Sequence, residues 1–299
     1  MNNLVSIIIP TRNRSAILAR CLAALSAGAR DLAPPEVIVV DDCSNESICE
    51  VVDQFHSKTQ WPVLCLRQDR PLGANAARNA ALRVAHGEII VIVDDDVLVT
   101  EGWLSKLAAG LSDDFPVVSG PVRLVIEGPV LGKHRKEVQA FFGEILRSPV
   151  GLDGQQLPVF ANLAAYRKVF ERADFDESLR PPIEEADWLQ RAGVRCGFVP
   201  DAWVWHYKTP EALHPGSVLA GVWRRGAEGG WWARERLKIP ARERWALARL
   251  SLRTSLRAFG HAGLQRCWGG VVVGLGELST ALALAGMVNR GPRVPESWR

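Results

Sequence analysis

The stretch Gly87-Glu88-Ile89-Ile90-Val91-Ile92-Val93-Asp94-Asp95-Asp96 decides the fold of this 299-residue chain. Its five consecutive apolar, β-branched residues are typical of a strand that is buried on both faces of a parallel sheet. The three carboxylates must then emerge where this strand leaves the sheet. Adjacent carboxylates repel one another, and a divalent cation shared with a phosphate group would remove the repulsion. We therefore expect a ligand site at these aspartates; the alternative is a solvated acidic turn.

The composition fits one large core with a smaller appended region, because 47% of the residues are hydrophobic. The formal net charge of +3 is too small to indicate a nucleic-acid partner, and we expect none. The N-terminus enters an apolar stretch without the charged segment of a signal peptide. These features predict a cytoplasmic protein.

The six cysteines show no C-x-x-C pair and no regular spacing. They stand at Cys21, Cys43, Cys49, Cys65, Cys196 and Cys267. This pattern favours buried, reduced thiols over disulfides, and it argues against a zinc site.

Strand and helix patterns alternate through the first hundred residues. Strands are expected at residues 4–9, 37–40, 63–66 and 89–93, with helices beginning near Ser15, Ser47 and Gly73. This alternation predicts an α/β fold with a parallel sheet and helices on both faces. Ligands bind outside the carboxyl ends of such strands, where three polar loops fall: Pro10 to Arg14, Asp41 to Asn45, and Asp94 to Asp96. Neither a G-x-G-x-x-G motif after the first strand nor a P-loop motif occurs, which argues against a dinucleotide cofactor and a P-loop nucleotidase.

Four motifs in this order resemble family 2 glycosyltransferases of the GT-A fold. They are Ser6-Ile7-Ile8-Ile9-Pro10-Thr11-Arg12-Asn13-Arg14, Glu36 to Ser44, Gly73 with Ala77 to Leu82, and Gly87-Glu88 leading to Asp94-Asp95-Asp96. The resemblance covers the first half and continues more loosely to about Tyr207. It implies a three-layer nucleotide-binding sandwich with a mostly parallel central sheet. We expect a catalytic domain at 1–208, with a nucleotide-sugar half at 1–100 and an acceptor half at 101–208, and a helical extension at 209–299.

The resemblance also implies the donor and metal residues. The nucleotide-sugar set is Pro10, Thr11, Arg14, Asp42, Gly73, Arg78, Asp94 and Asp95, and the metal set for Mn²⁺ or Mg²⁺ is Asp96, Asp94 and His206. Asp42 would accept a hydrogen bond from the base, and Arg78 would pair with the diphosphate. The alternatives are an Asx-type turn cap for Asp42, a surface helix arginine for Arg78 and a structural histidine for His206.

The catalytic base is expected at the start of a helix near residue 184. The family usually shows Glu-Asp there, with the aspartate as base, whereas this chain has Glu184-Glu185. We rank Glu185 first, Asp187 second and Glu184 third. The alternative is that these acids only favour the helix dipole.

The second half also predicts further helices. Residues from Lys133 to Arg147 show a helical apolar pattern. In a helix from Ala241 to Phe259, one stripe would hold Trp245, Leu252, Leu256 and Phe259, flanked by Arg242, Arg249 and Arg253. Such a helix suits an anionic membrane surface, or else packs on the catalytic domain with its arginines solvated. The stretch from Gly269 to Val288 is apolar, but Glu277 and several glycines argue against a membrane span, and we prefer an interfacial or oligomer-forming helical pair.

The function implied is inverting transfer of a sugar from a nucleoside diphosphate sugar, with uridine diphosphate as the default, to an acceptor hydroxyl. A glycan, glycolipid or lipid-linked acceptor of the cell envelope or of an extracellular polysaccharide is expected, with the protein peripheral on the inner face of the cell membrane. Two alternatives stay open. A non-catalytic nucleotide-sugar binder would explain the Glu-Glu departure, and a sugar-phosphate nucleotidyltransferase has a similar sheet but needs a glycine-rich first loop, which Pro10 to Arg14 is not.

Overall fold

The computed structural model describes residues 4–29, 33–126, 144–147, 149, 156–180, 183–209, 215–265 and 268–287. The chain divides into two compact units, each described below by itself. The first unit is Met1–Val125, Glu144–Leu179 and Glu184–Tyr207, and the second is Ile126–Gly143, Arg180–Ile183 and Lys208–Arg299.

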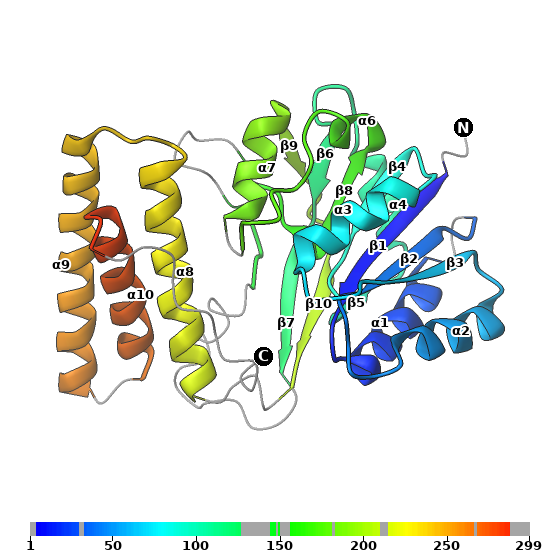
Figure 1. Cartoon of the computed structure of the whole chain (residues 1–299), viewed down its shortest axis with the longest axis horizontal. Helices are drawn as coiled ribbons and strands as arrows, with labels where there is room; N and C mark the ends of the chain where they lie inside the picture. The colour runs from blue at the N-terminus through cyan, green and yellow to red at the C-terminus, as the bar shows by residue number, and fades with distance from the viewer. Residues whose placement is uncertain are drawn as a thin grey trace. The chain divides into compact units, whose positions relative to one another are not determined.

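A seven-stranded sheet forms the centre of the first unit (Figure 1). Its order is β3 (Val63–Arg67), β2 (Glu36–Asp41), β1 (Val5–Thr11), β4 (Ile89–Ile92), β8 (Leu163–Tyr166), β6 (Val117–Ser119) and β9 (Cys196–Phe198). The first four strands run parallel, and β8 is antiparallel to both of its neighbours. Thr11 pairs with Asp41, and Asp41 pairs with Arg67, so the carboxyl ends of β1, β2 and β3 are aligned. The predicted mostly parallel sheet is confirmed.

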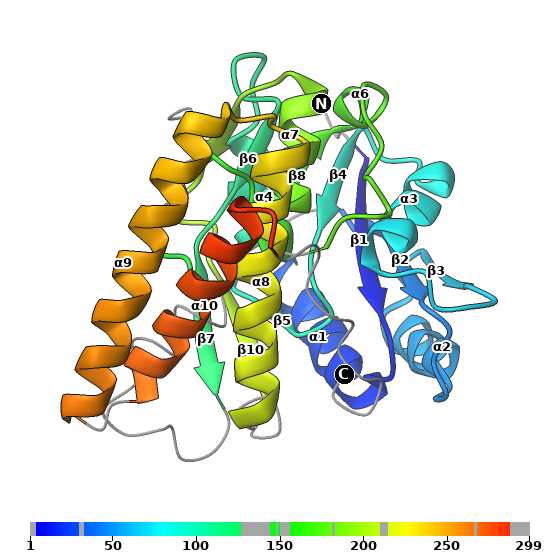
Figure 2. The same ribbon diagram turned by 60° about the vertical axis from the view of Figure 1, so that its left-hand side comes forward.

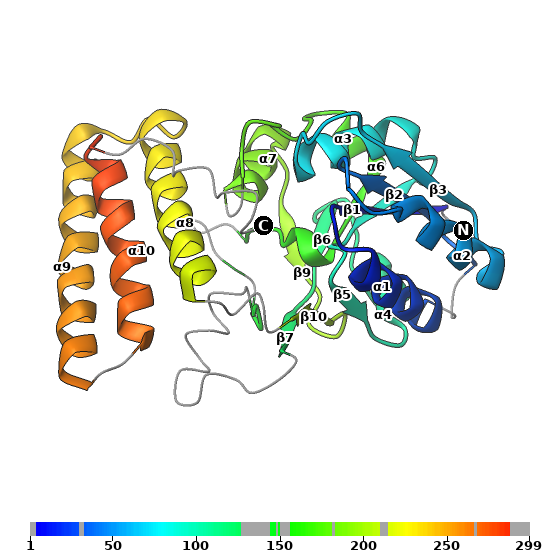
Figure 3. The same ribbon diagram turned by 60° about the horizontal axis from the view of Figure 1, so that its bottom comes forward.

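Helices cover both faces of this sheet because side chains alternate along each buried strand. Ile7 and Ile9 belong to the core under α1 (Ser15–Gly28), α2 (Ile48–Thr59) and α4 (Trp103–Ala109). Ile8 belongs to the core under α3 (Ala74–Val84), α6 (Arg167–Phe170) and α7 (Glu184–Ala192). Figure 3 shows α1 and α3 on opposite sides of the sheet. The unit is the three-layer sandwich that was expected.

A second, three-stranded sheet brings a distant segment to the aspartates. It has the order β5 (Val97–Val99), β10 (Val204–Lys208) and β7 (Val122–Ile126). His206 pairs with Val97, and the backbone N–H of Tyr207 donates to the carbonyl of Asp96 at 2.8 Å. The strand that follows the acidic triplet therefore determines where His206 lies.

The prediction of a helix from Lys133 to Arg147 is wrong at the C-terminal end of that segment. Of this segment the structure describes 144–147, and these four residues are not helical. Ile145 instead forms a β-bridge with Val122, with N–H···O distances of 2.7 and 2.8 Å. The rest of that prediction, residues 133–143, lies outside the described residues.

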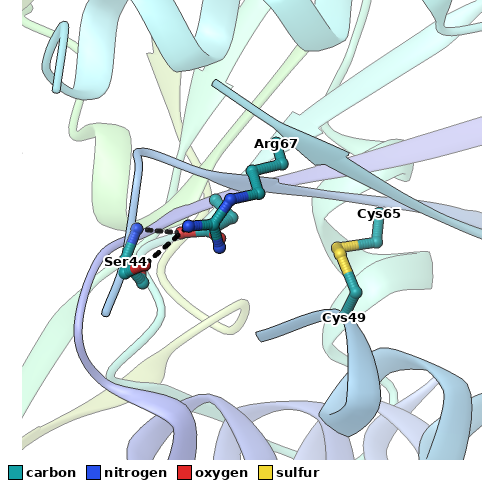
Figure 4. The surroundings of a disulfide bond; sticks show 5 residues. Ser44, Cys49, Cys65 and Arg67 are labelled. Carbon is teal, nitrogen blue, oxygen red and sulfur yellow. Dashed lines mark hydrogen bonds and ion pairs between the residues drawn. A yellow bond between two sulfur atoms is a disulfide. The ribbon is translucent and has the colours of Figure 1, made fainter. Parts of the chain in front are cut away.

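The expectation of six reduced thiols is also wrong. Cys49, in the first turn of α2, forms a disulfide with Cys65 of β3 (Figure 4). The α2–β3 connection brings the two Cα atoms to 5.5 Å, within disulfide range, although 16 positions separate them in the sequence. Cys21, Cys43 and Cys196 are thiols, and Cys267 lies outside the described residues.

The described part of the second unit contains three helices. They are α8 (Pro215–Glu235), α9 (Ala241–Gln265) and α10 (Trp268–Leu284), with α10 between the other two (Figure 2). Glycines permit close packing of α8 on α10: a Cβ atom added at Gly226 would lie 2.3 Å from the Gly276 carbonyl oxygen. Within the described residues, the structure contains no helix of sufficient length and apolarity to span a bilayer.

Candidate active site

The first two loops at the carboxyl edge of the sheet are bonded to each other. The N–H of Asn13 donates to Ser44 Oγ at 2.8 Å, and the N–H of Asn45 donates to Asn13 Oδ1 at 2.7 Å. Asn13 and Cys43 both adopt a left-handed backbone, with φ of 52° and 58°. These turns bring the Pro10–Arg14 and Asp41–Asn45 loops together, as the topology predicted.

Asp95 is buried and points toward the first loop. It accepts hydrogen bonds from Thr11 Oγ1 at 2.7 Å and from Arg14 Nη1 at 2.8 Å. Burial, opposed by the Arg14 charge, raises the pKa of Asp95 to about 6. Pro10, within β1, is buried directly before Thr11. The sequence assigned Asp95, Thr11 and Arg14 to donor binding. In the structure, the buried Asp95 and Thr11 and the partly exposed Arg14 bond to one another and stabilise the loop.

Asp94, Asp96 and His206 form a group with metal-binding geometry. One ligand atom from each lies within 4.8 Å of the others, and His206 Nε2 is 2.8 Å from Asp96 Oδ1. The Asp96 side chain is 2% exposed, whereas that of Asp94 is 33% exposed. Two carboxylates and an imidazole are a donor set that suits Mn²⁺. The residues present therefore fit the divalent cation that was expected.

Asp42 holds the start of α3. Its two carboxylate oxygens accept the backbone N–H groups of Leu72 at 2.6 Å and Gly73 at 2.9 Å. The Asx-type turn considered for Asp42 belongs to its neighbour: Asp41 Oδ1 accepts the N–H of Ser44 at 2.8 Å. Figure 4 shows Ser44 beside Arg67, which donates to Asp41 Oδ2 at 2.7 Å. Each Asp42 oxygen retains a lone pair for a ligand.

Arg78 is buried, which excludes the alternative of a solvated surface arginine. Its guanidinium carbon lies 4.7 Å from the centre of the Phe160 ring, and Nη1 donates to Asn75 Oδ1 at 2.9 Å. Nη2 is 3.4 Å from Asp94 Oδ1. The positive charge is therefore held beside the metal-binding group.

The three candidate bases differ in their partners. Glu185 Oε1 accepts the N–H of Phe160 at 2.8 Å, whereas Asp187 Oδ2 accepts from Arg191 Nε at 2.7 Å. Glu184 is buried. Burial, and next the negative charge of Glu184, raise the pKa of Glu185 to about 8 although part of its surface reaches solvent.

Arg78 and Asp94 also influence the pKa of Glu185, in opposite directions. Glu185 therefore lies within electrostatic range of Arg78 and Asp94.

Three residues of this site were not predicted from the sequence. Asn75 accepts a hydrogen bond from Arg78. The Phe160 ring stacks against the Arg78 guanidinium, and the Phe160 N–H donates to Glu185. Arg67 donates to Asp41. The signal for Asn75 was its i,i+3 spacing to Arg78 on one helix. Phe160 and Arg67 act through long-range contacts for which a single sequence carries no local signal.

The sequence model described as glycosyl transferase family 2 matches residues 6–173. The hyaluronan synthase of Pasteurella multocida is 37% identical over 123 residues, which are 40% of this chain and 12% of the relative. The poly(ribitol-phosphate) beta-N-acetylglucosaminyltransferase TarS of Staphylococcus aureus is 31% identical over 108 residues, 36% of this chain and 19% of TarS. Glycosyltransferase GlyG of Streptococcus pneumoniae is 32% identical over 121 residues, 40% of this chain and 39% of GlyG. The matches thus span only part of each of these relatives.

Solved structures share the fold at lower identity. A mannosyltransferase of Pyrobaculum calidifontis, in complex with GDP-Man and Mn²⁺, has a TM-score of 0.63 at 18% identity, covering 96% of this chain and 87% of that one. Residues 1–349 of S. aureus TarS, in complex with UDP-GlcNAc, have a TM-score of 0.54 at 17% identity, covering 93% and 90%. These likenesses identify the fold as that of GT-A glycosyltransferases.

Proposed function

Because the chain belongs to glycosyl transferase family 2, we propose that it moves a sugar from a nucleoside diphosphate sugar to an acceptor hydroxyl with inversion at the anomeric carbon. One observation carries this proposal. Asp94, Asp96 and His206 lie together at the carboxyl edge of the sheet, with the buried Arg78 beside them. The arrangement offers one place for a cation and for the diphosphate that a glycosyl donor releases.

The donor side uses groups that the fold fixes before binding. Asp42 and the Pro10–Arg14 loop hold the base, and Arg78 pairs with diphosphate oxygens. Asp94 would contact the ribose and would help to hold the metal. A uridine diphosphate sugar is the proposed donor, supported by the UDP-GlcNAc in the TarS structure, although the mannosyltransferase structure holds GDP-Man.

Asp94, Asp96 and His206 would hold Mn²⁺ or Mg²⁺. Such an ion supplies positive charge that stabilises the leaving diphosphate. Arg78 supplies a second positive charge from the protein, and its stacking on Phe160 keeps the guanidinium in place.

Glu185 is the proposed base. In its deprotonated form it accepts the proton of the acceptor hydroxyl as that oxygen bonds to the anomeric carbon from the face opposite the diphosphate. The bond from the anomeric carbon to the diphosphate breaks in the same displacement. Because the pKa of Glu185 is near 8, the base form becomes dominant only above neutral pH, and turnover should rise with pH.

The acceptor is proposed to be a growing glycan or a lipid-linked glycan. The support is that relatives are named as a hyaluronan synthase and as a transferase acting on poly(ribitol phosphate). Neither name specifies the acceptor of this chain.

The test is a panel of nucleotide sugars with Mn²⁺, with and without Asp96→Ala. We expect one donor to release nucleoside diphosphate and to transfer its sugar, with both lost in Asp96→Ala because the metal-binding group is incomplete. Unchanged, Mn²⁺-dependent turnover in this variant would refute the metal assignment. Binding without nucleotide release would support the non-catalytic binder, and formation of a nucleotide sugar from a triphosphate would support the nucleotidyltransferase.

A further inference from the structure

The outward side of α9 carries exposed tryptophan and leucine next to arginine. Trp245, Leu252 and Leu256 are 49%, 42% and 64% exposed. Arg242, Arg249, Arg253 and Arg257 are exposed on the same helix. We call this set of seven residues the outward face of α9. It is separate from the residues proposed for sugar transfer.

The orientation of the outward face is set because a neighbouring side of α9 packs on α10. Ser255 is buried, and its hydroxyl donates to the Gly274 carbonyl at 2.8 Å. The Phe259 ring lies so close to Gly274 that an added Cβ would be 2.8 Å from it. Phe259, which the sequence placed on the apolar stripe, thus faces the helix pair, while the other three residues of the stripe are exposed.

The exposed side chains form two adjacent bands. At about 100° per residue, Trp245, Leu252 and Leu256 fall within roughly 40° of the helix circumference. The four arginines follow in the next roughly 80°. This is the pattern of a helix that inserts a narrow apolar edge while its cations remain at the level of anionic head groups.

The charge of α9 is concentrated on this side. From Ala241 to Gln265 the sequence has five arginines and one acid, Glu243, an excess of four positive charges in a chain whose total is +3. Among the residues described, no acidic side chain forms an ion pair with Arg242, Arg249, Arg253 or Arg257. These charges are available to an external anionic surface.

We propose that the outward face of α9 binds the surface of an anionic lipid bilayer. A second copy of the chain fits poorly, because apposing two such faces would bring eight arginines together. Each arginine near an anionic membrane strengthens binding by roughly fivefold. Insertion of the apolar band between the lipids strengthens binding further. The helix would lie in the membrane plane, since no described helix is able to span a bilayer.

Vesicle flotation of the full chain tests this proposal. We expect the protein to float with phosphatidylcholine vesicles that contain about a third phosphatidylglycerol and not with phosphatidylcholine alone. Raising the salt should release it, because the arginine contribution is screened. The assay contains no donor sugar or metal, so its outcome is independent of the proposed transfer reaction.

Two variants separate the two bands. The variant without the apolar band is Trp245→Ser/Leu252→Ser/Leu256→Ser, and the variant with reversed charge in the arginine band is Arg249→Glu/Arg253→Glu. We expect each variant to reduce the floated fraction at least tenfold. The matched control is Leu250→Ser, since Leu250 is 62% exposed on α9 but lies outside the apolar band. It should float like the wild type, and circular dichroism should show that all variants are folded.

Three outcomes would overturn the proposal. The first is that the wild-type protein fails to float with the anionic vesicles, or floats equally with neutral ones, because it then has no site for an anionic surface. An equal loss in Leu250→Ser would show that the effect belongs to helix packing. Concentration-dependent dimers that the triple serine variant dissociates, without vesicle binding, would assign the face to a second copy.

Discussion

Glu185 combines a carboxyl group with a raised pKa, and it feels the charges of Arg78 and Asp94. Replacing it by glutamine keeps the size of the side chain and leaves an oxygen to accept the Phe160 N–H. The variant cannot accept a proton, so turnover should fall about 10²- to 10⁴-fold while donor affinity stays within a few-fold. Steady-state kinetics with titration of the donor measures both quantities.

Asp187→Asn is the matched control. Asp187 forms an ion pair with Arg191, four residues away on the same helix. The substitution should therefore lower the free energy of unfolding more than it lowers turnover. If Asp187→Asn instead lowers turnover while Glu185→Gln does not, the ranking of the bases is wrong.

The raised pKa of Glu185 also predicts a pH-dependent stability. The folded value is about 8 and the ordinary value is 4.5, so between these pH values the folded state binds more protons than the unfolded state. The contribution to stability is complete below about pH 4.5, falls as pH rises, and is lost above about 8. Urea unfolding of the metal-free protein at pH 5, 6, 7 and 8 should show a decline that is shallower in Glu185→Gln. Parallel curves for the two proteins would contradict this assignment.

At the level of single residues, the sequence predicted which acids lie at the sheet edge better than it predicted their hydrogen-bond partners. Asp94 and Asp96 follow a buried strand, and their position at the sheet edge follows from topology. Topology does not predict that Asp95 points toward Thr11 and Arg14, because three consecutive acids look alike in a sequence. The same limit applies to Asp41 and Asp42, of which the first caps the turn.

At the scale of elements, β3 links the disulfide to the Asp41–Asn45 loop. Cys65 and Arg67 are two positions apart on this strand; the first is bonded to α2 and the second donates to Asp41 and to the Ser44 carbonyl. A constraint on β3 therefore also restrains the Asp41–Asn45 loop.

Removing this disulfide should lower the free energy of unfolding and weaken donor binding. For cysteines 16 positions apart, the chain-entropy effect is about 3 kcal/mol. We expect Cys49→Ser/Cys65→Ser to lose roughly this amount in urea unfolding and to bind the donor several-fold more weakly. Reductant should bring the wild type to the variant's midpoint and leave the variant unchanged. A wild-type midpoint that does not respond to reductant would contradict the proposed restraint.

Regular elements were predictable where periodicity is local. Buried β-branched runs predicted β1, β2 and β4, and the alternation of strands and helices predicted that these strands run parallel. The pairing of β10 with β5 was not predictable, because residues about 105 positions apart meet by tertiary packing alone. The disulfide escaped prediction for the same reason, since the proximity of Cys49 and Cys65 arises only when α2 packs beside β3.

At the scale of the whole molecule, the two compact units have separate apolar cores. The two large clusters lie in the first unit, and the two small ones, around Val222 and Ala248, lie in the second. The predicted boundary at residue 208 is next to Tyr207, the last residue of the first unit. Whether the units behave as independent domains remains a prediction that unfolding experiments can test.

Calorimetry with ligand provides that test. All proposed donor and metal residues belong to the first unit, so UDP and Mn²⁺ together should stabilise that unit alone. At about 100 times the dissociation constant the gain is about 2.7 kcal/mol, which corresponds to roughly 5–10 °C in Tm for a domain of this size. We expect two transitions, of which one shifts with ligand. Asp96→Ala should abolish the shift without moving the other transition. A single transition that shifts as a whole would show that the units unfold together, and an unchanged shift in Asp96→Ala would locate the metal elsewhere.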